Sequence, residues 1–205
     1  MKRKLSKRGL LTARIMKDGQ VNLTFGRKKL AFILPEIFSE GWAKHTAKAS
    51  SKVKGQQALV TVPDGTIGLK TSVKPTKNGI QVSAVLTPLS DVKIIHIRQV
   101  VNLRYNDWAG KAFRLGTKQG TIPVKPQADN KISEGKSVRL VLGPQASLGG
   151  KSLQIQAPRL QLVLQDNRQW TPFLHAFVTK GEPSEPAWIW KKGVKKEYRM
   201  NVTVS

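Results

Sequence analysis

The residue types in this chain that could do chemistry are aromatic rings placed beside lysine and arginine. They form two clusters, one in the loop region 104–120 and one near the C-terminal end. An exposed aromatic ring stacks on a sugar ring or a base, and a neighbouring cation binds a carboxylate or phosphate. The clusters therefore predict a binding site, although such tryptophans could instead close the ends of a core. The predicted ligand-binding residues are Arg104, Tyr105, Trp108, Lys111, Trp190 and Lys192.

Two acidic residues, Asp107 and Asp166, lie in loops that also carry aromatic residues. Glycosidases place two carboxylic acids on either side of the bond that they cleave, so this pair is a candidate catalytic pair. Nearby lysines lower the pKa of a carboxyl group, which suits a nucleophile better than a general acid. The favoured alternative is that each aspartate bonds its own backbone in a turn.

The sequence contains no spacing that is typical of a metal or cofactor site. His45, His96 and His175 are far apart and share no ligand motif, and the chain has no cysteine. Glycine-rich phosphate loops, dinucleotide fingerprints and nucleophile motifs are also missing from the sequence. We therefore predict no metal ion, no cofactor and no thiol chemistry.

Positive charge is the strongest feature of the composition. Lysine and arginine number 36 against 12 acidic residues, which gives a net charge of +24. Such a chain attracts polyanions, namely nucleic acid, anionic lipid or acidic polysaccharide. Residues 1–9 are predicted to form a flexible polyanion-binding arm, although a charged surface also serves solubility alone. The arm residues are Lys2, Arg3, Lys4, Lys7 and Arg8.

The elements that must position these residues are β-strands. In Ser152–Trp170, apolar and polar residues alternate in two runs separated by Pro158 and Arg159, which indicates two consecutive strands forming a central pair. Asp18-Gly19 between alternating runs predicts a hairpin. Turn signals recur about every 8–12 residues, and no helix longer than about two turns is expected. The predicted fold is an all-β, antiparallel two-sheet β-sandwich, large and jelly-roll or supersandwich-like, with residues 10–205 in one domain.

Two stretches, Asp91–Gly116 and Leu160–Trp170, carry a resemblance to a known family. The order PLSDVKIIHI, VVNLRYNDWAGKAFRLG and then RLQLVLQDNRQW resembles the β-sandwich modules that precede the catalytic domain in multidomain bacterial glycoside hydrolases. The resemblance implies an accessory module whose sugar-cleaving acids lie on a downstream domain. It also implies a secreted or periplasmic location.

Together these features predict a non-catalytic module that binds an anionic polymer, with an acidic polysaccharide as the leading ligand. One alternative is a nucleic-acid-binding or virion-type sandwich with a basic arm, and another is a glycoside hydrolase that uses the aspartate pair. The sequence has no apolar run of about 18 residues, so no membrane-spanning helix is expected, and the N-terminus lacks the pattern of a signal peptide. It leaves the oligomeric state open.

Overall fold

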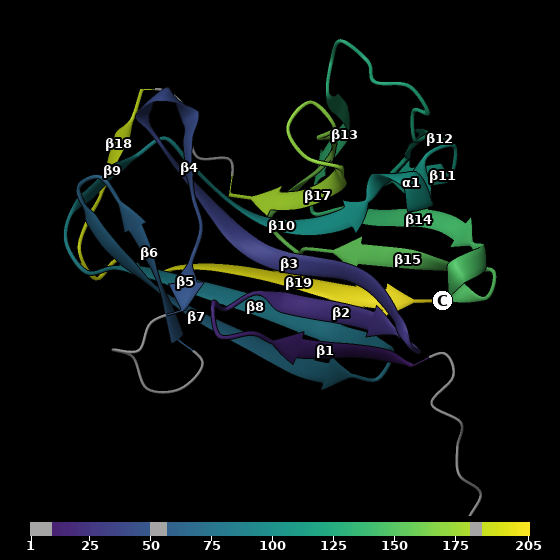
Figure 1. Cartoon of the computed structure of the whole chain (residues 1–205), viewed down its shortest axis with the longest axis horizontal. Coiled ribbons are helices and arrows are strands. Elements are labelled where there is room, and N and C mark those ends of the chain that lie inside the picture. Colours follow the sequence, from purple (N-terminus) through teal and green to yellow (C-terminus); the bar gives the residue numbers. More distant parts are fainter. Residues whose placement is uncertain (1–9, 50–56, 181–185) are drawn as a thin grey trace, which may run out of the picture.

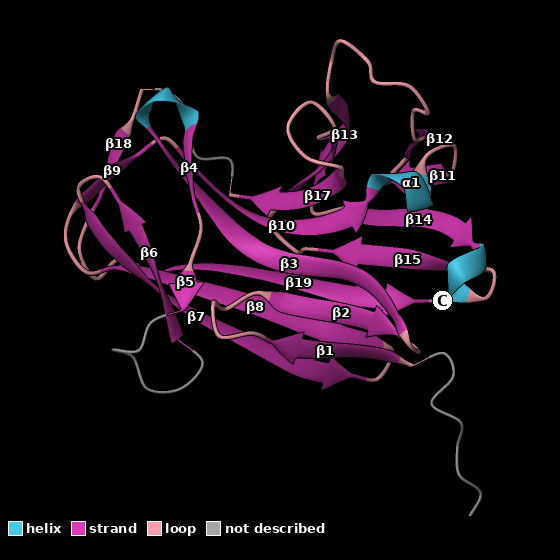
Figure 2. Ribbon diagram, in the orientation of Figure 1, coloured by secondary structure: helices cyan, strands magenta, loops and turns pink. Residues whose placement is uncertain are grey.

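The chain folds into two large antiparallel β-sheets and one small one, as the computed structural model shows (Figure 1). The structure describes residues 10–49, 57–180 and 186–205. Within them, helix is limited to α1 (Tyr105–Trp108) and two 3₁₀ turns at Glu40–Trp42 and Ala146–Leu148 (Figure 2). No described helix is long and apolar enough to cross a membrane. The predicted all-β antiparallel sandwich with little helix is confirmed.

The first sheet has eight strands in the order β1-β2-β3-β10-β17-β16-β13, and β4 pairs with β3. β1 and β2 form the predicted hairpin, in which the Asp18 carboxylate accepts a hydrogen bond from the backbone N–H of Gln20 at 3.0 Å. The strands are β1 (Leu11–Ile15), β2 (Val21–Phe25), β3 (Lys28–Ser39), β4 (Ala43–His45), β10 (His96–Arg104), β13 (Lys131–Lys136), β16 (Gln161–Asp166) and β17 (Phe173–Thr179).

The second sheet has nine strands in the order β12-β11-β14-β15-β19-β8-β7-β6-β5. Its strands are β5 (Lys48–Ala49), β6 (Gln57–Val62), β7 (Gly65–Thr76), β8 (Gly79–Pro88), β11 (Ala112–Leu115), β12 (Lys118–Thr121), β14 (Arg139–Gln145), β15 (Lys151–Gln156) and β19 (Lys196–Val204). A separate two-stranded sheet joins β9 (Val92–Ile94) to β18 (Trp188–Trp190).

One large hydrophobic core gathers alternate residues of the strands. In β10, Ile97, Val101 and Leu103 are fully buried in this core. Val100 points to the opposite, outer face of the first sheet, where it forms a second small cluster with Val163 and Phe177. The outer face of this sheet is therefore partly apolar, which is unusual for a face that meets only water.

The two alternating runs of Ser152–Trp170 do not form the predicted strand pair. The first run is β15, which pairs with β14 and β19 in the second sheet. The second run is β16, which pairs with β13 and β17 in the first sheet. The chain crosses between the sheets at Pro158 and Arg159, and Arg159 adopts a positive φ of 65° there. The runs are consecutive strands of different sheets.

Gly79, the first residue of β8, provides a test of how closely the strands of the second sheet pack. A Cβ atom at this position would collide with the backbone carbonyl of Val202 and lie 2.7 Å from Cγ2 of Thr203. We expect Gly79→Ala to lower the free energy of unfolding by about 1–3 kcal/mol, measured by urea denaturation. Gly68→Ala is the matched control, because its nearest neighbour would be 3.5 Å away. An equal effect of both substitutions would contradict this packing.

Candidate binding pocket

A buried ion pair lies on the outer face of the first sheet. Arg98 of β10 stands opposite Glu36 of β3 in the sheet register. The Nε and Nη2 groups of Arg98 donate to Oε2 of Glu36 at 2.8 and 2.7 Å, and Lys44 Nζ lies 3.4 Å from Oε1. Burial raises the pKa of Glu36, but the positive charges of Arg98 and Lys44 outweigh burial and hold the pKa below its ordinary value. Glu36 is therefore an ionised carboxylate at neutral pH.

Aromatic rings surround the guanidinium group of Arg98. Its central carbon lies 4.9 Å from the ring centre of Phe38 and 4.6 Å from that of Phe177, within the range of cation–π attraction. Phe38 in turn meets Trp42 edge to face, with 5.6 Å between the ring centres. The ring contacts and the ion pair together fix the position of Arg98.

These groups border a pocket of about 490 Å³, a size that suits a small ligand. Trp42 and Trp170 line the pocket although they remain 50% and 63% exposed, and Phe38 completes its apolar wall. The polar lining comes from one side chain each of β4, β10 and β16 and from side chains of the loops 122–130 and 167–172. These polar residues are Lys44, Arg98, Asn130, Gln165, Asn167 and Thr171. The pocket thus combines ring faces with hydrogen-bonding amides.

A neutral imidazole lies beside this pocket within the sheet. His175 of β17 stands between Asn102 and Gln165 in the register and is 1% exposed. Burial lowers the pKa of His175 to about 4, so the ring is uncharged at neutral pH. Neither of its ring nitrogens has a hydrogen-bond partner among the described residues. Across residues 10–49, 57–180 and 186–205, no three His, Asp and Glu side chains gather in a way that could hold a metal ion.

The aromatic residues proposed from the sequence lie in the core instead of on the surface. Trp108 and Trp190 are each 1% exposed, and Tyr105 is equally buried. The indole N–H of Trp190 donates to the carbonyl of Val194 at 2.7 Å, and the Tyr105 hydroxyl donates to the carbonyl of Pro123 at 2.7 Å. Rings enclosed in this way offer no face on which a sugar or a base could stack.

The predicted cations are exposed, and only Arg104 borders a hollow together with one of those rings. Lys111 and Lys192 lie on the surface, and the backbone N–H of Lys192 donates to Asp91 at 2.8 Å. Arg104 does border a smaller hollow of about 330 Å³ that is also lined by Asp107 and Trp108. The basic arm, which includes Lys2, Arg3, Lys4, Lys7 and Arg8, lies outside the described residues.

The two aspartates have different roles in the structure. Asp107 is exposed in α1, whereas Asp166 is buried at the end of β16. Burial raises the pKa of Asp166, but hydrogen bonds and positive charge from Arg168 outweigh burial and lower the pKa overall. Because Arg168 occupies both carboxylate oxygens of Asp166, this group is bound as a structural ion pair.

Sequence reasoning missed the residues that form the pocket. Glu36 and Arg98 did leave a signal, since each is a charged residue inside a largely apolar strand, in ILPEIF and IIHIRQVV respectively. A charge at such a position is almost never buried without a partner. Trp42 and Trp170 were visible as tryptophans near turns, but nothing local to them showed that they would remain exposed.

Comparison with known proteins places the fold among sugar-related structures. No family model and no curated protein matches the chain. A putative aldose 1-epimerase from Escherichia coli aligns with a TM-score of 0.58 at 8% identity, covering 96% of each chain. A galactose mutarotase related enzyme from Lactobacillus acidophilus aligns at 0.51 and 8% identity, covering 96% of this chain and 95% of that one. A protein from Synechocystis aligns at 0.53 and 8% identity, covering 95% and 91%.

These similarities correct the functional prediction. Two of the three proteins are named for aldose epimerisation and galactose mutarotation, and none of the three is named as an accessory module of a glycoside hydrolase. The prediction of a non-catalytic module for an anionic polymer is therefore wrong, and none of the three similar structures is named for nucleic-acid binding or glycoside hydrolysis, the two alternatives. The burial of Trp108 and Trp190 is the physical reason that the lead prediction fails, because these two rings have no exposed face on which a ligand could stack. The coarser part of the resemblance, a β-sandwich shared with carbohydrate-related proteins, is confirmed.

Proposed function

We propose that this protein binds an aldose in the pocket lined by Trp42 and Trp170. The observation that carries the proposal is the pair of exposed indole rings in one pocket. Large exposed aromatic rings are unfavourable in water and mark binding surfaces. A pyranose ring has C–H faces that pack on indole, as apolar ligand faces do on aromatic rings generally.

The polar groups of the pocket suit the hydroxyl groups of a sugar. Asn130, Gln165 and Asn167 each carry an amide, which both donates and accepts hydrogen bonds as a hydroxyl does. Arg98 and Lys44 add donors, and the carboxylate of Glu36 offsets part of their charge. The names of the structures with the same fold agree with a sugar ligand, but fold alone does not determine function, so the proposal rests on the pocket.

To test the proposal, the protein is titrated with D-glucose and with D-galactose, and binding is measured by calorimetry or by tryptophan fluorescence. We expect saturable binding that Trp170→Ala and Trp42→Ala each weaken about 10-fold, since one stacked ring contributes on the order of 1–3 kcal/mol. Leu89→Ala is the control, because Leu89 is a similarly exposed apolar residue that does not line the pocket. Wild-type protein that binds neither sugar, or tryptophan variants that bind as well as wild type, would refute the proposal.

A second candidate function is interconversion of the two anomers of the bound aldose. That reaction removes a proton from the C1 hydroxyl and delivers one to the ring oxygen, so it needs a donor and an acceptor close together. Lys44 lines the pocket and is the candidate donor, and the candidate acceptor is the carboxylate of Glu36, which lies 3.4 Å from Lys44 Nζ and is buried behind the pocket lining. Polarimetry with fresh α-D-glucose tests the function: a rate above the buffer rate that Lys44→Met removes supports it, and a rate equal to buffer rejects it.

A further inference from the structure

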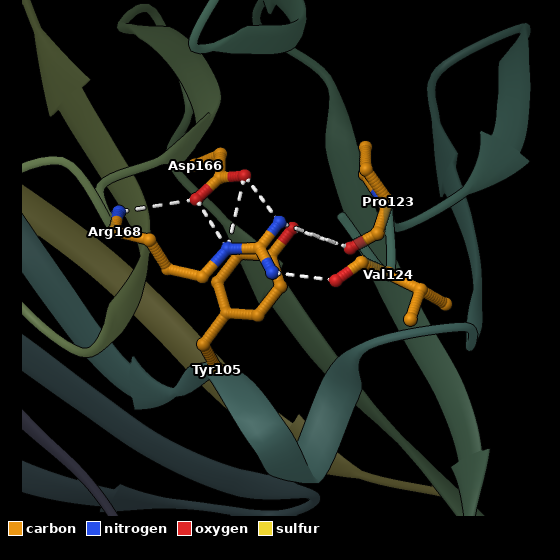
Figure 3. A network of polar contacts seen from close by, with 5 residues as sticks. All are labelled: Tyr105, Pro123, Val124, Asp166 and Arg168. Atoms are coloured by element: carbon orange, nitrogen blue, oxygen red, sulfur yellow. Dashed lines mark hydrogen bonds and ion pairs between the residues drawn. The ribbon is translucent and has the colours of Figure 1, made fainter. Parts of the chain in front are cut away.

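Arg168 lies at the centre of a network that joins separate parts of the chain (Figure 3). Its Nε donates to Oδ1 of Asp166 at 3.0 Å, and its Nη2 donates to Oδ2 of the same carboxylate at 2.7 Å. The guanidinium group also reaches two backbone carbonyls: Nη1 donates to that of Val124 at 2.6 Å, and Nη2 donates to that of Pro123 at 3.3 Å. One side chain thus connects the end of β16 to the segment that follows β12.

The ring of Tyr105 forms the base on which this network rests. The central carbon of the Arg168 guanidinium lies 3.7 Å from the centre of the ring (Figure 3). The Tyr105 hydroxyl donates to the Pro123 carbonyl, so α1 is attached to the same segment. Burial and the neighbouring Asp166 carboxylate raise the pKa of Tyr105 to about 12, so this hydroxyl stays protonated well above neutral pH.

The two segments that Arg168 joins both carry pocket residues. The loop 167–172 contains Asn167, Trp170 and Thr171, and the segment 122–130 ends in Asn130. The backbone N–H of Asp166 donates to the carbonyl of Asn130 at 2.7 Å, which joins the two segments again at the pocket. Within the loop, the backbone N–H of Trp170 donates to the Asn167 carbonyl at 3.0 Å. One wall of the pocket therefore lies on the two segments that Arg168 joins.

The contacts of Arg168 require arginine. A guanidinium group has five N–H donors in a fixed plane, and that plane also stacks on an aromatic ring. A lysine has three donors at one point and cannot reach both carboxylate oxygens, two carbonyls and the face of Tyr105 together. Arginine is therefore the residue type that can hold both segments at once.

We propose that Arg168 is a positioning residue for the sugar pocket, holding Trp170 and Asn130 where a bound aldose would contact them. The proposal rests on the proposed function for its ligand. A positioning role can be distinguished from a role in stability alone, because a lysine at position 168 keeps the positive charge but loses the planar geometry of the guanidinium group.

The test replaces Arg168 with lysine in the whole chain, labelled with 5-fluorotryptophan. The protein has five tryptophans, and Trp170→Phe assigns the fluorine resonance of Trp170. We expect Arg168→Lys to shift or broaden this resonance and to weaken D-glucose or D-galactose binding about 10-fold, while the fraction of folded protein stays that of the wild type. Asn130→Ala added to Arg168→Lys is expected to lose less affinity than the sum of the single losses, because both act on the same wall.

Matched variants keep the result interpretable. Arg199→Lys is the control, since Arg199 forms an ion pair with Glu197 in β19, which belongs to the other sheet. If Arg168→Lys unfolds, Tyr105→Phe is used instead, because it removes the hydroxyl that donates to Pro123 and should move the Trp170 resonance in the same way. A wild-type Trp170 resonance in the folded variant overturns the proposal. If wild-type protein binds neither sugar, the proposed function fails, and the fluorine spectrum still decides whether Arg168 positions Trp170.

Discussion

Replacing Trp108 with alanine is expected to lower the free energy of unfolding by about 3–5 kcal/mol, the range found for removal of a large buried aromatic side chain. Trp108 is 1% exposed and belongs to the main core. Its substitution leaves a cavity that the two sheets can fill only in part. Urea denaturation at neutral pH, followed by circular dichroism, measures the loss.

Trp170→Ala is the matched variant, in which an exposed indole ring is removed in place of a buried one. Because Trp170 is 63% exposed, its removal should change stability by no more than about 0.5 kcal/mol, although it should weaken sugar binding. The folded fraction of Trp108→Ala should bind sugar with wild-type affinity, since the pocket has no contribution from that ring. If the two variants were equally stable, the assignment of one ring to the core and the other to the pocket would be incorrect.

Strand type and local turns could be predicted from the sequence because they depend on neighbouring residues. Alternation of apolar and polar residues predicted β1 and β2, and Asp18-Gly19 predicted the turn between them. The same alternation could not assign β15 and β16 to their sheets. It shows that one face of a strand is buried but carries no information about which sheet covers that face.

The site was harder to predict because burial of a tryptophan is decided by tertiary contacts. Trp108 and Trp170 both follow polar loop residues, and lysine or arginine lies close to each in the sequence. Trp108 turns inward with α1, whereas Trp170 stays outside because its loop is attached to Asp166 and the segment 122–130. Local composition is the same in both cases, so only the packed structure distinguishes a core ring from a pocket ring.

Long-range pairing accounts for the rest of the site. Glu36 and Arg98 are 62 positions apart and meet only because β3 and β10 are neighbours in the sheet. A charged residue in an apolar strand indicates that a partner exists, but it does not identify the partner. The register of β3 and β10 identifies Glu36 as the partner of Arg98, and the aromatic pocket that Arg98 lines can then be recognised.

Replacing Glu36 with alanine is expected to lower the free energy of unfolding by about 3 kcal/mol, since removing one member of a buried ion pair leaves the other charge without its partner. Arg98 would keep its contacts to Phe38, Phe177 and Gln165 but lose the carboxylate. Glu36→Gln preserves the volume and one acceptor and should cost less. Lys131→Ala is the control, because its pair with Glu134 lies on the surface and such pairs contribute about 0–1 kcal/mol.

The pH dependence of this loss identifies the carboxylate as its cause. The pKa of Glu36 in the folded protein is below the ordinary value of 4.5, so the ionised group stabilises the fold above that pH. This contribution disappears as the pH falls through the lowered pKa, where Glu36 becomes protonated. The difference in unfolding free energy between wild type and Glu36→Gln should therefore be constant near neutral pH and shrink in acid below about pH 4.5. A difference that stays constant down to the lowest pH at which both proteins fold would show that packing, and not the charge of Glu36, holds Arg98 in the pocket.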